Sequence, residues 1–139
     1  MSYFELVELI EELKDKPRND NDFNTINQNS LNFNGNILLR FIDKITIFII
    51  NRLDKDCRKL VESFSNFRPT EEINLELIEF NKEIEYLKKY ANLNVFPNEV
   101  KNNITNIIDI KRKDLFDHLL EFSNAISNDE LKNIINSYK

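Results

Sequence analysis

Apolar residues recur at steps of three and four along most of the chain, which is the spacing of one face of an α-helix. In the opening stretch SYFELVELIEELK, Ser2 and Glu5 have the spacing of a capping box, in which each residue bonds to the backbone of the other. Pro17 closes this first helix, because its ring is not tolerated in a helix interior. The apolar face of the helix consists of Tyr3, Leu6, Val7, Ile10 and Leu13.

Residues 16–36 form a polar segment crowded with asparagine, and we expect a loop there. A pure linker has no need of apolar residues, so those in this segment predict that the loop packs partly on the body of the protein. They are Phe23, Ile26, Leu31 and Phe33. Because loops often carry function, this segment is a candidate mobile or functional loop.

A second helix is predicted over about residues 36–64, where the apolar residues keep a mostly helical spacing. The run ITIFII at 45–50 also suits a strand. No turn signal brackets those six residues, however, and the charged stretch NRLDKDCRK continues the helical phase. The first half of this predicted helix is apolar on nearly all sides, which indicates that it is the central, most buried helix of the fold.

A third helix is expected after FRPT, with Thr70 as its cap and Glu71 and Glu72 in its first turn, where carboxylates are favourable. Its apolar residues form a heptad seam, with alternating steps of 4 and 3. The seam consists of Ile73, Leu77, Phe80, Ile84, Leu87 and Ala91. Such a seam fits either a helix inside a bundle or a short coiled-coil contact.

The stretch NLNVFPN breaks the chain again, and Asn98 after Pro97 is expected to cap a fourth helix. Its apolar residues are Val100, Ile104, Ile107, Ile108, Leu115, Leu119 and Phe122. In SNDE, Ser127 and Glu130 have the spacing of a second capping box, at the start of a short last helix.

Composition agrees with a helical fold. The chain has 139 residues, of which 41% are hydrophobic and 31% charged, enough for one domain with its own core. It contains one Gly and three Pro, whereas a sheet protein needs turn residues about every 8–12 positions. We therefore predict a single helical domain over residues 1–139. It is an all-α, mostly antiparallel bundle of four main helices plus a short C-terminal helix, with the Asn-rich loop at 16–36.

Charge and cysteine content narrow the classes of function. The formal net charge of −5 argues against nucleic-acid or anionic-membrane binding, which needs a basic footprint, and fits a basic protein partner. A single cysteine, Cys57, excludes an internal disulfide framework. The N-terminus lacks the basic start of a signal peptide, and no apolar run is long enough to span a bilayer, so we expect a cytoplasmic protein.

No cofactor or metal is expected. His118 is the only histidine, so helical di-iron sites and catalytic zinc sites lack their ligands. With one Gly the chain has no phosphate-binding loop, and it has no Gly-x-Ser-x-Gly nucleophile elbow. As a lone thiol, Cys57 is expected to pack or to lie at the surface rather than to act as a nucleophile.

Arg112 and His118 are the one pair that indicates catalysis. They lie six positions apart in the stretch KRKDLFDHLL of the predicted fourth helix. An arginine followed by a few residues and a histidine resembles the signature of HEPN-domain RNases, which are small all-α bundles. That family usually has Asn, Asp or His directly after the arginine, where this chain has Lys113.

The resemblance implies a homodimeric, metal-independent RNase. Arg112 would hold the phosphate, and His118 would act as general base or acid on a ribose 2′-OH. The alternative is a structural pair, in which His118 is half-buried and hydrogen-bonded and Arg112 pairs with acidic side chains.

A row of acidic and aromatic residues follows the third helix, one position ahead of its apolar seam. The row consists of Glu72, Glu76, Glu79, Glu83, Tyr86 and Tyr90. Like charges at i,i+4 oppose each other by about 0.2–0.5 kcal/mol per pair, which a basic partner would relieve. The carboxylates would steer the encounter and the tyrosines would serve as interface anchors. The alternative is a solvated helix face.

These observations favour a non-enzymatic protein-binding module. We expect an immunity protein or antitoxin that neutralises a basic toxin, for example a nuclease, by direct binding through the row. Two alternatives stay open. One is the HEPN-like RNase that uses Arg112 and His118. The other is a structural module that self-associates through the seam at 73–91. Both alternatives predict a homodimer.

Overall fold

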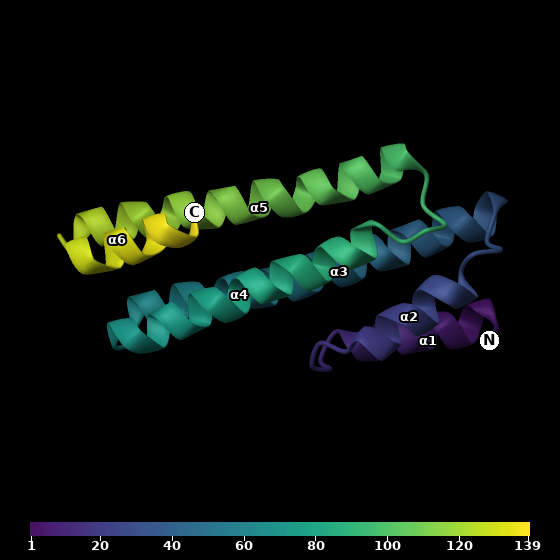
Figure 1. Ribbon diagram of the computed structural model, residues 1–139, viewed down its shortest axis with the longest axis horizontal. Helices are drawn as coiled ribbons and strands as arrows, with labels where there is room; N and C mark the ends of the chain where they lie inside the picture. Colours follow the sequence, from purple (N-terminus) through teal and green to yellow (C-terminus); the bar gives the residue numbers. More distant parts are fainter.

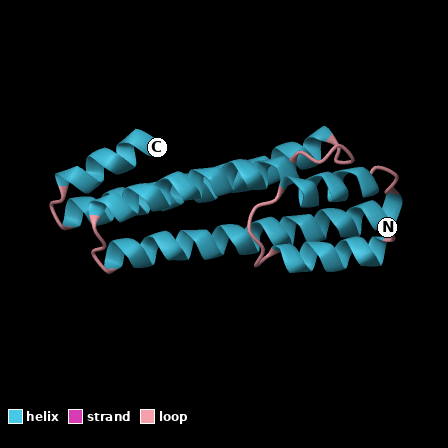
Figure 2. Cartoon of the chain, turned by 60° about the horizontal axis from the view of Figure 1, so that its bottom comes forward, coloured by secondary structure: helices cyan, strands magenta, loops and turns pink.

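The computed structural model describes all 139 residues and contains six α-helices and no strand, which confirms the all-α prediction (Figure 2). The helices are α1 (Tyr3–Leu13), α2 (Asp20–Asn29), α3 (Gly35–Ser65), α4 (Thr70–Ala91), α5 (Asn98–Ala125) and α6 (Asp129–Tyr138). The four main helices predicted from the sequence are α1, α3, α4 and α5, and the short C-terminal helix is α6.

The three longest helices, α3, α4 and α5, run the length of an elongated molecule (Figure 1). They pack against one another, and α4 runs antiparallel to both neighbours. The shorter helices cover different halves of this core. α1 packs on α3 at one end, with α2 beside it, whereas α6 folds back on α4 and α5 at the other end. One half of α3 and α4 therefore has no α1–α2 layer over it.

The second helix of the fold, α2, is the main departure from the predicted loop at 16–36. The Asn19 side chain caps it by accepting from the backbone N–H of Asn21 at 2.8 Å, and Asp20 and Asp22 lie in its first turn. Its low helix propensity is offset by burial of Ile26, which is fully inaccessible to solvent. The segment does pack on the body of the protein, as the apolar residues predicted, but as a helix.

Local signals account for only some helix ends. The prediction that Thr70 and Asn98 are caps was wrong: each is the first residue of its helix, α4 or α5, the preceding proline holds the cap position, and no side-chain hydrogen bond caps either helix. Ser2 caps α1 as predicted, since its Oγ accepts from the backbone N–H of Glu5 at 3.2 Å. Ser127 is not the cap of α6, however. It has a positive φ of 55° and ends α5 in a Schellman motif, closed by Asn128 N–H donating to the carbonyl of Ser123 at 3.0 Å. Asn128 caps α6 instead, by accepting from the N–H of Leu131 at 3.1 Å.

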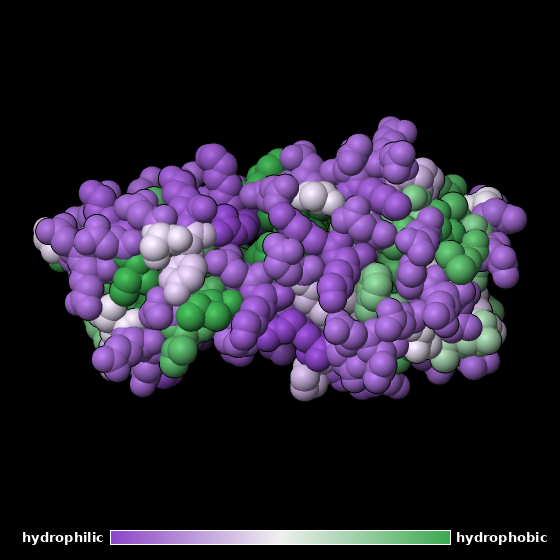
Figure 3. Space-filling model, in the orientation of Figure 1, coloured by the Kyte–Doolittle hydropathy of each residue, from purple (hydrophilic) through white to green (hydrophobic).

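The core is one cluster of 28 buried hydrophobic residues. It includes all six residues of the predicted seam on α4, each at most 3% exposed. The seam therefore packs inside the bundle and is not available for contact with another copy. Most of the face in Figure 3 is hydrophilic, and apolar atoms gather at the end formed by α1, α2 and the start of α3 and in a second cluster toward the other end, near α6 and the start of α4. No helix combines the length and the apolar character that a membrane crossing requires.

Candidate functional site

The centre of the predicted row holds a buried ion pair. Glu83 on α4 is 3% exposed, and Arg52 on α3 donates to both of its carboxylate oxygens, from Nε at 2.5 Å and from the second guanidinium nitrogen at 2.9 Å. The remaining nitrogen of Arg52 donates to the carbonyls of Leu13 at 2.7 Å and Lys16 at 2.8 Å. One guanidinium thus joins α3, α4 and the C-terminal end of α1.

Aromatic rings complete the surroundings of this guanidinium. Its central carbon lies 5.1 Å from the ring centroid of Tyr86 and 5.9 Å from that of Phe48, which is cation–π geometry. Burial acts to lower the pKa of Arg52, but the hydrogen bonds and the charge of Glu83 outweigh it and leave the pKa raised. Arg52 therefore stays charged, and its charge is neutralised by Glu83 inside the protein.

The two tyrosines of the row are also internal. Tyr86 is 4% exposed and Tyr90 is fully buried, and their hydroxyls share a hydrogen bond of 3.1 Å. Phe48 of α3 and Phe23 of α2 meet the ring of Tyr90 edge-on, at 4.9 and 5.3 Å between centroids. Burial raises the pKa of the Tyr90 hydroxyl, which stays protonated. Together with Glu83, these residues are removed from the surface that a partner can reach.

The accessible part of the row is its first half, Glu72, Glu76 and Glu79. Glu72 pairs with Arg68 at 3.6 Å on the exposed surface. Glu79 accepts from Arg18 at 2.6 Å and pairs with Lys82 at 3.4 Å. Hydrogen bonds from Arg18 hold the pKa of Glu79 below its ordinary value. Whether this half binds a partner stays a prediction.

A groove of about 460 Å³ opens beside these residues, between α3 and α4. Carboxylates, cations and apolar side chains all line it: Pro17, Arg18, Arg52, Asp56, Lys59, Leu60, Leu75, Glu76, Glu79, Phe80 and Glu83. Four of these residues are acidic and three are basic. Within it, Oε2 of Glu76 is buried and has no hydrogen-bond partner, and it is the one buried side-chain nitrogen or oxygen atom of the structure in that state.

Asp56 lies in the same groove, facing the ion pair from α3. Burial, together with the negative charge of Glu83, raises its pKa to about 6, against the opposing effects of Arg52, Lys59 and Lys55. The ionised carboxylate of Asp56 is therefore poorly compensated by its neighbours.

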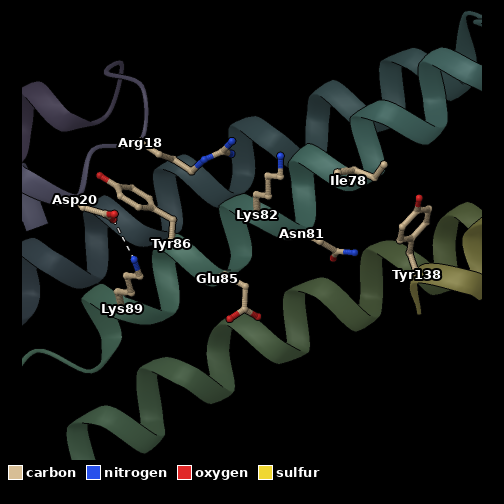
Figure 4. Close-up of a pocket in the computed structure, with 9 residues that line it drawn as sticks. All are labelled: Arg18, Asp20, Ile78, Asn81, Lys82, Glu85, Tyr86, Lys89 and Tyr138. Carbon is tan, nitrogen blue, oxygen red and sulfur yellow. Dashed lines mark hydrogen bonds and ion pairs between the residues drawn. The ribbon is translucent and has the colours of Figure 1, made fainter.

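A second hollow, of about 560 Å³, lies between α4, the chain before α2 and the end of α6 (Figure 4). Three cations line it, but each is paired. Arg18 and Lys82 bind Glu79, and Lys89 binds Asp20 at 3.0 Å, as the dashed line in Figure 4 shows. Since its cations are already neutralised, this hollow is a weaker candidate for ligand binding than the groove.

The structure gives Arg112 and His118 separate surroundings. Arg112 donates to the backbone carbonyl of Tyr138 and, at 3.3 Å, to the side chain of Asn81, and its guanidinium lies 4.4 Å from the ring centroid of Phe116. It joins α4, α5 and α6. His118 is exposed rather than half-buried. The expectation that Arg112 pairs with acidic side chains was also wrong, because a carbonyl, an amide and a ring take their place.

Neither cysteine nor metal chemistry is indicated by the geometry. Burial raises the pKa of the Cys57 thiol to about 11, so the nucleophilic thiolate is scarce at neutral pH. No three His, Cys, Asp or Glu side chains are grouped so that they could hold a metal ion.

Sequence reasoning missed Arg18 and Arg52, the cations that hold the row. Both act across long separations in the chain: 61 residues between Arg18 and Glu79 and 31 between Arg52 and Glu83. One signal was present for Arg52. It lies seven residues after Ile45 on the buried face of α3, so a charged residue there required an internal partner.

The fold and site define an all-α bundle with a charged groove on the half of α3 and α4 that α1 and α2 leave open. Comparison of the chain with protein-family models, with curated proteins and with solved structures gave no match.

Proposed function

We propose that the protein is a binding module for a basic protein, and that it acts as an immunity protein or antitoxin which neutralises a toxin by covering it. The observation that carries this proposal is the open half of α4, where Glu72, Glu76 and Glu79 follow one another along the surface. A net charge of −5 adds long-range attraction for a basic partner.

Apolar side chains beside these carboxylates supply contact area. Leu75 is 62% exposed on the same helix and Phe67 is 68% exposed just before it. Interfaces combine such apolar residues at the centre with charged residues at the rim. The proposal includes a cytoplasmic location, with which the free thiol of Cys57 is consistent.

The test measures binding of the protein to a panel of purified basic nuclease domains, by biolayer interferometry at low and high salt. We expect at least one domain to bind, with an affinity that falls as salt rises, and its nuclease activity to be inhibited. The triple variant Glu72→Gln/Glu76→Gln/Glu79→Gln should bind more weakly. A panel in which no domain binds, or equal binding by the triple variant, contradicts the proposal.

A further inference from the structure

The groove lies where the α1–α2 layer ends. α1 stops at Leu13 and the chain turns at Pro17, which forms one edge of the groove. Beyond it, the α1–α2 layer does not cover the second half of α3 and the first half of α4, which α5 and α6 contact on other sides (Figure 1). The groove is therefore open to solvent, although its floor reaches the buried Arg52–Glu83 pair.

Two of its four carboxylates, those of Asp56 and Glu76, form no hydrogen bond or ion pair with a cation. Arg52 occupies both oxygens of Glu83, while Arg18 and Lys82 bind Glu79. Asp56 and Glu76 belong to neither network. A buried carboxylate oxygen without a donor, as at Oε2 of Glu76, is unfavourable and rare in folded proteins. A donor from outside the chain would remove that deficit.

The remaining walls suit a long side chain with a cationic end. Leu60, Leu75 and Phe80 line the groove with apolar surface that can pack against an aliphatic stem. The volume of about 460 Å³ is typical of pockets that enclose small ligands. Arg52 shows within the same groove how a guanidinium is held, by a carboxylate fork and an aromatic face.

We propose that this groove is an arginine-binding subsite, which takes the guanidinium of one arginine from the basic partner, with Glu76 and Asp56 as the receiving carboxylates. The inference rests on the proposed function, because that partner supplies the arginine. A planar guanidinium presents five donors and can serve two carboxylates at once, which a lysine ammonium does less well. Lys59 also lines the groove and competes with an incoming cation for the same carboxylates. An arginine that is held in place on a protein surface loses less freedom on binding than a free cation does, so it is the favoured occupant.

The experiment titrates the ¹⁵N-labelled protein with N-acetyl-arginine-N-methylamide and follows amide shifts by NMR. We expect the shifts to centre on Asp56 and Glu76, with weak affinity because a single side chain makes few contacts. Glu76→Gln should weaken binding at least about fivefold, since it removes a charge-assisted hydrogen bond. Glu71→Gln is the matched control: it removes the same charge from the exposed first turn of α4, at a residue outside both the groove and the row, and should leave binding unchanged.

A second measurement uses the unmodified protein and does not depend on any variant. The carboxyl carbon of Asp56 should titrate with a pKa near 6, and the arginine amide should lower that value, because a bound cation favours the ionised form. An unchanged titration of Asp56 at saturating amide overturns the subsite.

A short arginine–glycine repeat peptide separates this inference from the proposed function. If the peptide binds but Glu76→Gln and Glu71→Gln weaken it equally, or if the amide shifts scatter over the surface, the groove is not the site and diffuse acidity explains the binding. Tighter binding of the lysine amide or of spermidine also overturns the arginine assignment. If neither peptide nor amide binds while a nuclease domain of the panel does, the subsite fails and the proposed function stands.

Discussion

Arg52 on α3 and Glu83 on α4 form a bidentate ion pair inside the bundle, and the same guanidinium holds the carbonyls of Leu13 and Lys16. The pair is less than one-tenth exposed on both sides. It occupies the point where α1 ends and the open groove begins. Its contribution is therefore to hold the α1–α2 layer on one half of the molecule and to form the floor of the groove on the other.

Replacing Glu83 by glutamine should lower the free energy of unfolding by about 3–5 kcal/mol, because it leaves the Arg52 charge buried without a counter-ion. Urea denaturation followed by circular dichroism measures the change. Glu79→Gln is the control, since that carboxylate is 58% exposed and solvent screens its ion pairs, so the substitution should have a much smaller effect. Equal effects of the two substitutions would show that the ion pair is not buried as described.

The Tyr86–Tyr90 hydroxyl pair predicts a double-mutant cycle with strong coupling. Tyr86→Phe leaves the buried hydroxyl of Tyr90 without its partner and should cost about 1–3 kcal/mol. Adding Tyr90→Phe removes the stranded group, so the double variant should be no less stable than Tyr86→Phe alone. Additive losses in thermal or urea unfolding would mean that water or another group satisfies each hydroxyl independently.

The sequence predicted correctly that the heptad seam is buried. It predicted wrongly that the whole neighbouring row lies at the surface, since Glu83, Tyr86 and Tyr90 are buried. The seam is apolar, and its spacing alone required burial. The row lies one position earlier on α4, so its environment depends on what covers that side. Because α2 was taken for a loop, no cover for Tyr86 and Tyr90 was expected. Phe23 of α2 packs directly on Tyr90.

The groove depends on contacts that no local pattern contains. Arg18 comes from the chain before α2, Asp56 from α3 and Glu76 from α4, and only the packing of helices brings them together. The spacing of carboxylates on α4 did identify Glu76 and Glu79. It gave no indication that Glu79 is paired and that Oε2 of Glu76 is buried and unpartnered, since both depend on residues distant in sequence.

Glycine at position 127 should stabilise the protein. Ser127 is exposed, and its φ of 55° lies in the left-handed region, where a residue with a Cβ is strained and glycine is not. We expect Ser127→Gly to raise the free energy of unfolding by about 0.5–1 kcal/mol. Asn124→Gly is the contrast: it lies in the last turn of α5 with helical geometry and should destabilise by about 0.3 kcal/mol, the difference in helix propensity between asparagine and glycine. The same sign for both variants would contradict the Schellman ending of α5.

Asp56 predicts a specific pH dependence of stability. Its pKa is raised from 3.8 to about 6 on folding, so the folded state binds the proton more tightly than the unfolded state does. Its protonation therefore favours the folded state below about pH 4, and this contribution is lost as the pH rises to about 6. Asp56→Asn should remove this dependence and make the protein more stable at pH 7 by about 1 kcal/mol, allowing for solvent screening of a partly exposed group.

Urea denaturation of the unmodified protein and of Asp56→Asn between pH 4 and pH 7 tests this pH dependence. The difference between their free energies of unfolding should grow as the pH rises through that window. The carboxylates that pair with cations, such as Glu79, have the opposite sign and are common to both proteins, so they cancel in the difference. A constant difference across the window would show that Asp56 has an ordinary pKa.

Arg112 and His118 should respond differently to alanine substitution. Arg112→Ala loses the hydrogen bonds to Tyr138 and Asn81 and the contact with Phe116, and should cost about 1.5–3 kcal/mol of stability. His118→Ala removes an exposed side chain and should change stability by less than about 0.5 kcal/mol.

Growth of a bacterial culture after induction tests the RNase alternative with the same two positions. Under the binding-module proposal, cells that express the unmodified protein and cells that express His118→Ala should both grow normally. Because His118 is exposed, its replacement by alanine leaves the fold intact, so a difference in growth between the two cultures reports a loss of chemistry rather than unfolding. Growth arrest by the unmodified protein that His118→Ala relieves would make the histidine catalytic. It would replace the neutralising function proposed here with RNA cleavage.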